Sequence, residues 1–109
     1  SGALSIAAST GAGTSPSAVS VTGTDVSGVV ALTTGTSPTV NAVLATITYN
    51  TAFSTAPVVV ITPANAATAS LAAAQAVWVN ITTTGFSINT NATAVVSSTA
   101  YKWNYVVIQ

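Results

Sequence analysis

The sequence predicts an all-β fold, an antiparallel β-sandwich of about six to eight short strands with no long helix. Short runs rich in Val, Ile and Thr recur along the chain, and in most of them apolar and polar residues alternate. Clusters of Gly, Asn, Ser and Pro separate these runs at the spacing of about 8–12 residues that is typical of sandwiches. No segment carries a broad apolar stripe with helical spacing. A closed barrel is the alternative arrangement of the same strands.

The final segment, residues 100–108, is predicted to be a central strand onto which earlier segments pack. Tyr101, Trp103, Tyr105 and Val107 occupy alternate positions, so a pleated strand turns all four side chains to one face. Aromatic side chains dominate the energetics of cores and interfaces. We therefore expect this aromatic face to pack in the core or in an interface.

The earlier strands follow from the same alternation of residues. Pro57 opens one strand, where a missing N–H is tolerated, and the unbroken β-branched run 58–61 predicts a strand covered on both faces. The Ala-rich segment 63–76 has no apolar stripe and is predicted to be a long loop with room for one turn of helix. Strands are expected at residues 19–22, 27–34, 43–49, 57–61, 77–81 and 86–90.

The length of 109 residues suits one domain. We assign residues 19–109 to the sandwich and residues 1–18 to an N-terminal arm or tail. Leu4 and Ile6 share a parity that allows a short strand, so this segment is either a flexible tail or an arm that pairs with a neighbouring subunit.

The chain is almost free of charge, which excludes several kinds of partner. Asp25 and Lys102 are the only charged side chains, so 2% of residues are charged where about a quarter is usual. One Lys cannot neutralise a row of phosphates, so we expect neither nucleic acid nor a charged membrane surface as partner. No apolar run approaches the roughly 20 residues of a membrane span. The surface must therefore be hydrated through Ser, Thr and Asn, or be buried in an assembly. We expect a homo-oligomer, because its interfaces need no charge.

The composition also argues against catalysis. A Ser or Thr nucleophile needs a base, and the chain has no His. A carboxylate pair needs a second acid, and Asp25 is the only one. The chain has no Cys, so it offers no thiolate ligands. We predict no enzymatic activity, no catalytic residue, no cofactor and no metal site.

Two tryptophans, one asparagine and the two charged residues are the candidate functional residues. Trp78 and Asn80 share one face of their strand, while Trp103 belongs to the aromatic face of the final strand. All three are candidates for contact with a ligand or a subunit. A Trp side chain presents a wide apolar face and one hydrogen-bond donor. Asp25 and Lys102 form an ion pair, or both lie in solvent.

Four segments carry a family resemblance that spans roughly residues 19–109. ATITYNTAFSTAPVVVITPANAA, VWVNITTTGFSINT and YKWNYVVIQ resemble the C-terminal β-sandwich modules of bacteriophage tail fibres and other virion surface proteins. The upstream segment TGTDVSGVVALTTGTSPT resembles the front of those modules. The order of these elements, ending in a strand that carries Trp103, is similar to that of the H-type lectin domain, a six-stranded sandwich that forms trimers and binds sugars.

The resemblance implies a non-enzymatic structural and adhesive module on the virion surface. It would form a trimer at the tip of a tail fibre or appendage and display a surface for host attachment. Other virion proteins and a host-surface glycan are the implied partners, although no sugar-binding residues can be carried over to this chain. The alternatives are a capsid decoration (cement) protein, a lectin-like carbohydrate-binding module, and an extracellular filament subunit in which residues 1–10 donate a strand to the next copy.

Overall fold

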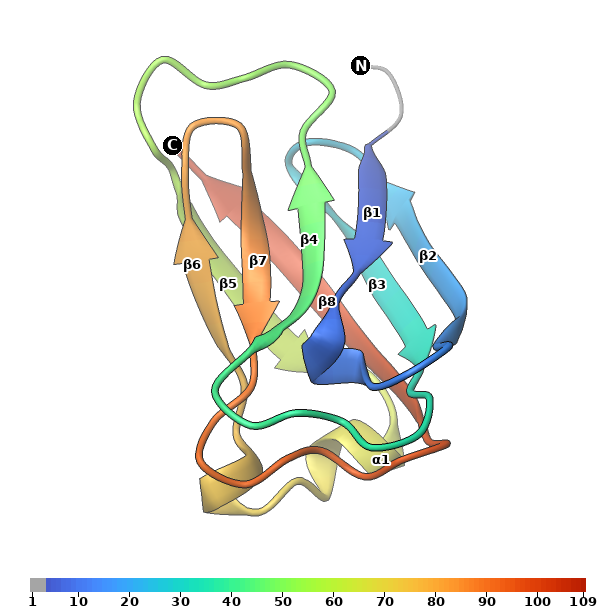
Figure 1. Ribbon diagram of the computed structural model, residues 1–109. Coiled ribbons are helices and arrows are strands. Elements are labelled where there is room, and N and C mark those ends of the chain that lie inside the picture. The colour runs from blue at the N-terminus through green and yellow to red at the C-terminus, as the bar shows by residue number, and fades with distance from the viewer. Residues whose placement is uncertain (1–3) are drawn as a thin grey trace.

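A computed structural model describes residues 4–109 of the chain and shows two antiparallel sheets packed face to face (Figure 1). The first sheet has the strand order β1-β4-β7-β6, and the second has the order β2-β3-β8-β5. The predicted all-β sandwich is confirmed, and the strands form two separate sheets in place of a closed barrel. The strands are β1 (Ser5–Ala8), β2 (Ser17–Gly23), β3 (Ser27–Thr33), β4 (Val43–Thr48), β5 (Val58–Pro63), β6 (Trp78–Ile81), β7 (Gly85–Asn89) and β8 (Ala100–Ile108).

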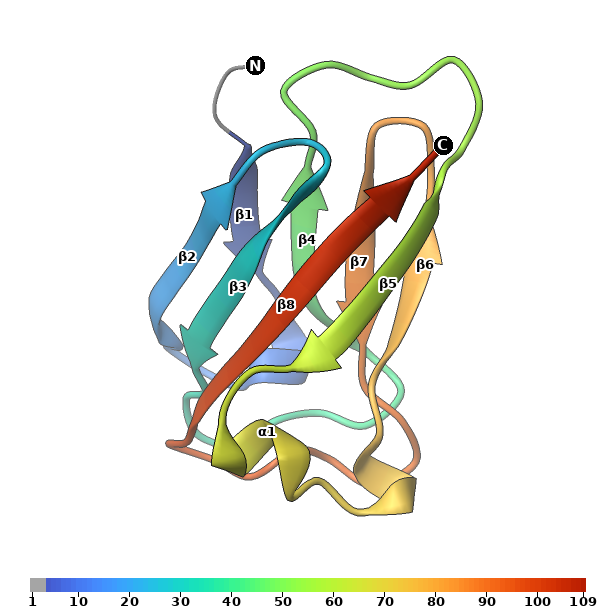
Figure 2. The same cartoon turned by 180° about the vertical axis from the view of Figure 1, so that it is seen from behind.

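Strand β8 is a central strand of the second sheet, flanked by β3 and β5 (Figure 2). Its residues alternate strictly between exposed and buried, and the buried ones are Tyr101, Trp103, Tyr105 and Val107. Trp103 is only 2% exposed. Burial of an aromatic side chain contributes about 4–6 kcal/mol of gross hydrophobic free energy, so this strand supplies much of the core. The predicted central strand is confirmed, and its aromatic face packs in the core.

Strand β5 differs from its prediction, because only one of its faces is covered. It pairs with β8 alone and is therefore an edge strand. Val58 and Val60 are 58% and 46% exposed, while Val59 between them is buried. A continuous β-branched run is typical of a strand with two buried faces, but it suits an edge strand equally well when the exposed face is itself apolar.

The sandwich begins upstream of residue 19. Strand β1 pairs with β4 of the same chain, from Ser5 opposite Thr48 to Ala8 opposite Ala45. Ala12 is fully buried in the core. A Cβ atom at Gly11 would lie 2.7 Å from the Val43 carbonyl oxygen, so any larger residue here would force the neighbouring backbone to shift. Residues 4–18 are thus part of the fold, and residues 1–3 of the predicted arm lie outside the described region.

The segment between β5 and β6 contains two short helical turns, α1 (Ala66–Ala69) and the 3-10 turn Ala73–Gln75. The Asn65 side chain caps α1 by accepting a hydrogen bond from the Thr68 amide at 3.0 Å. In both views this segment closes one end of the sandwich (Figures 1 and 2). No helix within residues 4–109 is long and apolar enough to cross a membrane.

Candidate functional site

The outward face of the first sheet is lined by uncharged polar side chains. Thr46 lies opposite Ser87, and Ser87 lies opposite Asn80, so these three form one row across β4, β7 and β6. Residues opposite one another in antiparallel strands project to the same face. This surface, called the polar face below, holds a shallow hollow of about 200 Å³. The polar side chains around the hollow are Thr46, Thr48, Asn80, Thr82, Thr84 and Ser87.

Trp78 stands at the margin of the polar face. It lies two residues before Asn80 on β6, and its side chain is 53% exposed. Its cross-strand partner Asn89 is buried and donates a hydrogen bond to the Ser87 hydroxyl at 3.2 Å. Among residues 4–109, neither the Asn80 amide nor the Thr46 hydroxyl has an intramolecular partner. The predicted pair Trp78 and Asn80 therefore meets on one accessible surface that offers an indole ring and free neutral hydrogen-bonding groups.

The outward face of the second sheet is apolar where β5 meets β8. Val58 lies opposite Ile108, and Val60 lies opposite Val106, so two cross-strand pairs form a compact group called the apolar patch below. Val58 and Ile108 are 58% and 51% exposed, and Val60 and Val106 are 46% and 44% exposed. Exposed β-branched side chains grouped in this way mark a contact surface more often than scattered ones do.

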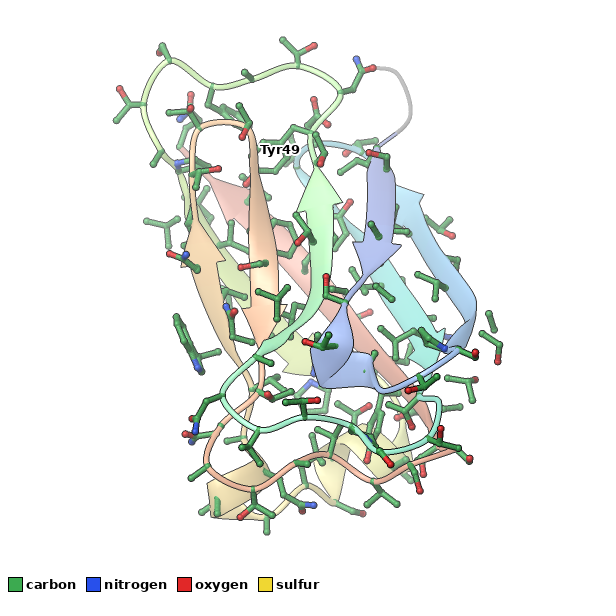
Figure 3. All side chains as sticks on the ribbon, in the orientation of Figure 1. Tyr49 is labelled. Carbon is green, nitrogen blue, oxygen red and sulfur yellow. The ribbon has the colours of Figure 1, made fainter. Side chains whose placement is uncertain are left out.

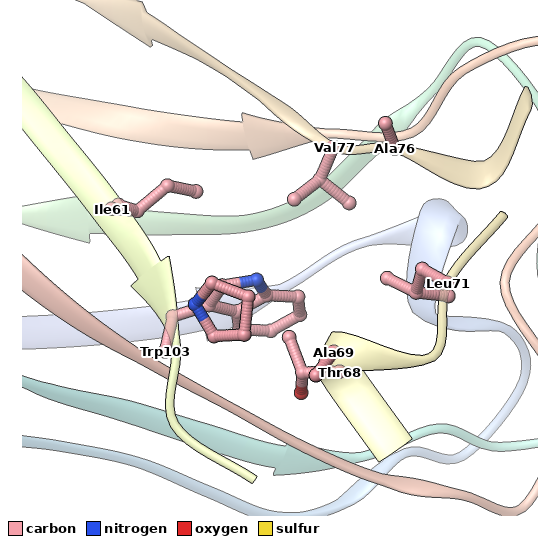
Figure 4. A pocket seen from close by; sticks show the side chains of 8 residues that line it. Ile61, Thr68, Ala69, Leu71, Ala76, Val77 and Trp103 are labelled. Atoms are coloured by element: carbon pink, nitrogen blue, oxygen red, sulfur yellow. The ribbon is translucent and has the colours of Figure 1, made fainter. Parts of the chain in front are cut away.

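A second hollow, of about 220 Å³, lies beside β5 under the α1 segment (Figure 4). Ile61, Leu71, Val77 and Trp103 line it together with smaller apolar residues. Thr68 is the polar side chain of the lining, and its hydroxyl already donates to Asn65 Oδ1 at 2.7 Å and accepts from the Lys102 amide at 2.8 Å. Trp103 is thus a core residue that also lines this apolar hollow, and it lies apart from the polar face.

The two charged residues are not brought together. The Asp25 carboxylate is only 8% exposed and accepts hydrogen bonds from the amides of Asn50 at 2.8 Å and Thr51 at 3.0 Å. Lys102 lies on the outward face of β8. The turn that contains Asp25 lies beside Val106 and Val107 of the same strand, because Ser27 is opposite Val106 and the Val107 amide donates to the Val26 carbonyl oxygen. Lys102 is four residues from Val106, or about 13 Å along the strand. The alternative that both charges lie in solvent is also wrong for Asp25, which is a buried anchor for the loop after β4.

Tyr49 and Tyr105 lie near this carboxylate. The Tyr105 hydroxyl donates to the Thr24 carbonyl oxygen at 2.6 Å, whereas the buried Tyr49 hydroxyl has no partner among the described residues. Figure 3 shows Tyr49 where β4 runs into the following loop. Burial raises the pKa of both tyrosines, and the negative charge of Asp25 raises it further. Sequence patterns gave no indication of this cluster, because its members come from three separate turns and strands.

Comparison of the chain with protein-family models, with curated proteins and with solved structures finds no match. The two outward faces are therefore the candidate functional surfaces of the chain. One carries neutral polar groups and an exposed Trp78. The other carries the apolar patch.

Proposed function

We propose that this chain is a non-enzymatic structural and adhesive module of a virion, which assembles with copies of itself and displays the polar face toward a host surface. The contrast between the two outward faces carries this proposal. Isoleucine and valine gather on the second sheet, and hydroxyl and amide groups gather on the first. A module with one surface for assembly and another for display needs this division. The resemblance of residues 19–109 to virion sandwich modules supports the same role and favours a trimer at a fibre tip, with capsid decoration as the alternative.

The polar face suits a neutral carbohydrate as the host-surface ligand. Sugar hydroxyls both donate and accept hydrogen bonds, as do the Thr46 hydroxyl and the Asn80 amide. The indole of Trp78 offers a flat apolar surface for the C–H face of a pyranose ring. Neither Asp25 nor Lys102 is among the residues around the hollow of this face, so an uncharged ligand meets no desolvated charge there.

The absence of catalysis in this proposal follows from the chemical groups at hand. A hydrolytic or transfer reaction needs a group that moves a proton. Asp25 is the only carboxylic side chain, and each of its oxygens accepts a backbone amide. The hydroxyls of the polar face have no neighbouring base, since the chain contains no His.

A glycan array tests the adhesive part of the proposal. Wild-type protein should bind at least one neutral glycan, and Trp78→Ala and Asn80→Ala should each weaken that binding about tenfold or more, the equivalent of about 1.4 kcal/mol. Val26→Ala is the matched control, because Val26 is 58% exposed and lies in the turn between β2 and β3, away from the polar face. Wild-type protein that binds no glycan would remove carbohydrate display from the proposal.

Electron microscopy of particles labelled with an antibody against the chain tests its location. Label at fibre tips supports the first choice, and label over the capsid lattice supports the decoration alternative. If purified virus particles do not contain the chain, a role in the virion is contradicted.

A further inference from the structure

We infer that the edge of the sandwich formed by β5, together with the apolar patch, is the interface at which a second copy of this chain docks. The inference rests on the proposed self-assembly and names the surface and the partner that assembly would use. Three features of this edge meet on strand β5.

The first feature is the gathering of apolar side chains. Among the described residues, eight large apolar side chains are exposed, and four of these belong to the apolar patch. The four form two directly opposed pairs, Val58 with Ile108 and Val60 with Val106. Opposed β-branched side chains on a sheet give a flat surface that can pack against a similar one.

The second feature is the stretch of β5 between Pro57 and Pro63, whose backbone has an unpaired outer side. Its N–H and C=O groups pair with β8 on one side only. Proteins protect such edges with charged residues, prolines or β-bulges. Between Pro57 and Pro63 the strand has no charged residue, and its pairing with β8 runs without a register shift, whereas the edge strand β2 carries a shift between Ser17 and Ser20.

The third feature is the apolar hollow under the α1 segment. Ile61 and Pro63 line this hollow from the inward face of β5, while Val58 and Val60 belong to the patch on its outward face. One strand thus borders both apolar surfaces. A partner that lies along β5 would therefore contact the patch and the border of the hollow together.

The size of the patch defines how a partner must lie. Full burial of each such side chain removes about 60–120 Å² from water, and these side chains are about half exposed, so the patch supplies roughly 200 Å² of apolar area. A stable interface buries about 800 Å² on each partner. The patch is therefore the centre of an interface that must extend along β5 and over the hollow.

The charge of the surrounding surface selects a second copy as that partner. Lys102 is the only charged side chain on the second sheet, and the cross-strand register places the uncharged residues Ser27, Thr62 and Asn104 next to the patch on the outward face. A partner with ordinary surface composition would bury charges here without a counter-ion. A second copy of this chain has only two charged residues among its 109, so it buries few or none in the contact. Packing about a symmetry axis also places the apolar patch of one copy against the same patch of the other.

Light scattering after size exclusion measures the mass and tests the inference. Wild-type protein should elute at a multiple of 10.6 kDa. Val60→Lys and Val106→Lys should each shift the species toward the single-chain mass, because a charge would be buried at the centre of the interface. The matched controls are Ser20→Lys, on the exposed outward face of β2, and Thr46→Lys on the polar face, and both should keep the wild-type mass.

Circular dichroism shows whether each variant is folded. Where a Lys variant does not fold, the double variant Val60→Thr with Val106→Thr replaces it, since Thr has nearly the shape of Val but adds a hydroxyl. Its dissociation constant should rise about tenfold or more. A wild-type oligomer that keeps its mass in all patch variants overturns this interface while self-assembly stands. A wild-type protein that is a single chain at several hundred micromolar overturns both the interface and the self-assembly.

Discussion

Replacing Asp25, the only acidic side chain, by asparagine perturbs two specific hydrogen bonds. Both carboxylate oxygens accept backbone amides, from Asn50 at 2.8 Å and from Thr51 at 3.0 Å, and these bonds fasten the loop after β4 to the turn between β2 and β3. The Asn side chain has the same shape but offers one acceptor and one donor. One of the two backbone amides would therefore face an NH₂ group in place of an oxygen.

The expected loss follows from these two bonds. A hydrogen bond to a charged group contributes about 1.5–3 kcal/mol, and a buried donor left without a partner costs about 1–3 kcal/mol. Since Asp25 is only 8% exposed, water cannot fully replace the lost acceptor. We expect Asp25→Asn to lower the free energy of unfolding by about 2–4 kcal/mol, a large part of the 5–15 kcal/mol that is usual for a domain.

Urea denaturation at a fixed chain concentration measures this effect, because self-association would otherwise shift the midpoint. Lys102→Gln is the control, since it also removes one charge but at an exposed site, and it should change the free energy by less than about 0.5 kcal/mol. Equal losses in the two variants would refute the reasoning, because they would indicate an ion pair that the geometry excludes. A loss below about 0.5 kcal/mol for Asp25→Asn would refute the anchoring role.

Three further outcomes follow from the core. Tyr49→Phe removes a buried hydroxyl that has no partner among the described residues, so it should raise the free energy of unfolding by about 1 kcal/mol. Tyr105→Phe removes the hydrogen bond to the Thr24 carbonyl oxygen and should lower the free energy of unfolding by about 1 kcal/mol. Calorimetry that ranks the two variants in the opposite order would contradict these hydrogen-bond assignments. Gly11→Ala should lower the free energy of unfolding by about 1–3 kcal/mol in the same measurement, because the new methyl group meets the Val43 carbonyl at 2.7 Å, and an unchanged midpoint would count against that contact. Burial and the charge of Asp25 raise the pKa of both tyrosines, so the folded state holds their protons to higher pH than the unfolded state does. The stability that this difference contributes is fully present below about pH 10 and is lost as the pH rises through the raised pKa values. Urea midpoints should therefore fall above pH 10, and they should fall by less in the double Phe variant.

Alternation of residues was sufficient to predict the faces of the strands. The parity of Tyr101, Trp103, Tyr105 and Val107 grouped the residues that form the buried face of β8, and the parity of Trp78 and Asn80 placed them together on one face of β6, which is the exposed one. These predictions succeed because a strand has a period of two residues whatever its surroundings.

Other features depended on contacts between distant parts of the chain. The β-branched run of β5 does not distinguish a doubly covered strand from an edge strand with an apolar outward face. The anchoring of Asn50 and Thr51 by Asp25 joins segments 25 and 26 residues apart, and no local pattern predicts it. Segment 4–12 lacks a strong alternation, so its place in the first sheet comes from pairing with β4 and from close packing at Gly11.

The two outward faces belong to different sheets, and this separation has a consequence for binding strength. In the proposed assembly, copies would join through β5 of the second sheet, whereas the polar face lies on the first sheet. An array of such copies holds several weak sites at fixed spacing, so that once one site is occupied the others meet ligand at an effective concentration of about millimolar. Avidity of this kind multiplies the strength of a single contact by about 10²–10⁴. Under the proposed function, a shallow, uncharged surface with low affinity for one sugar ring would then be enough to hold a particle firmly to a cell that presents many such rings.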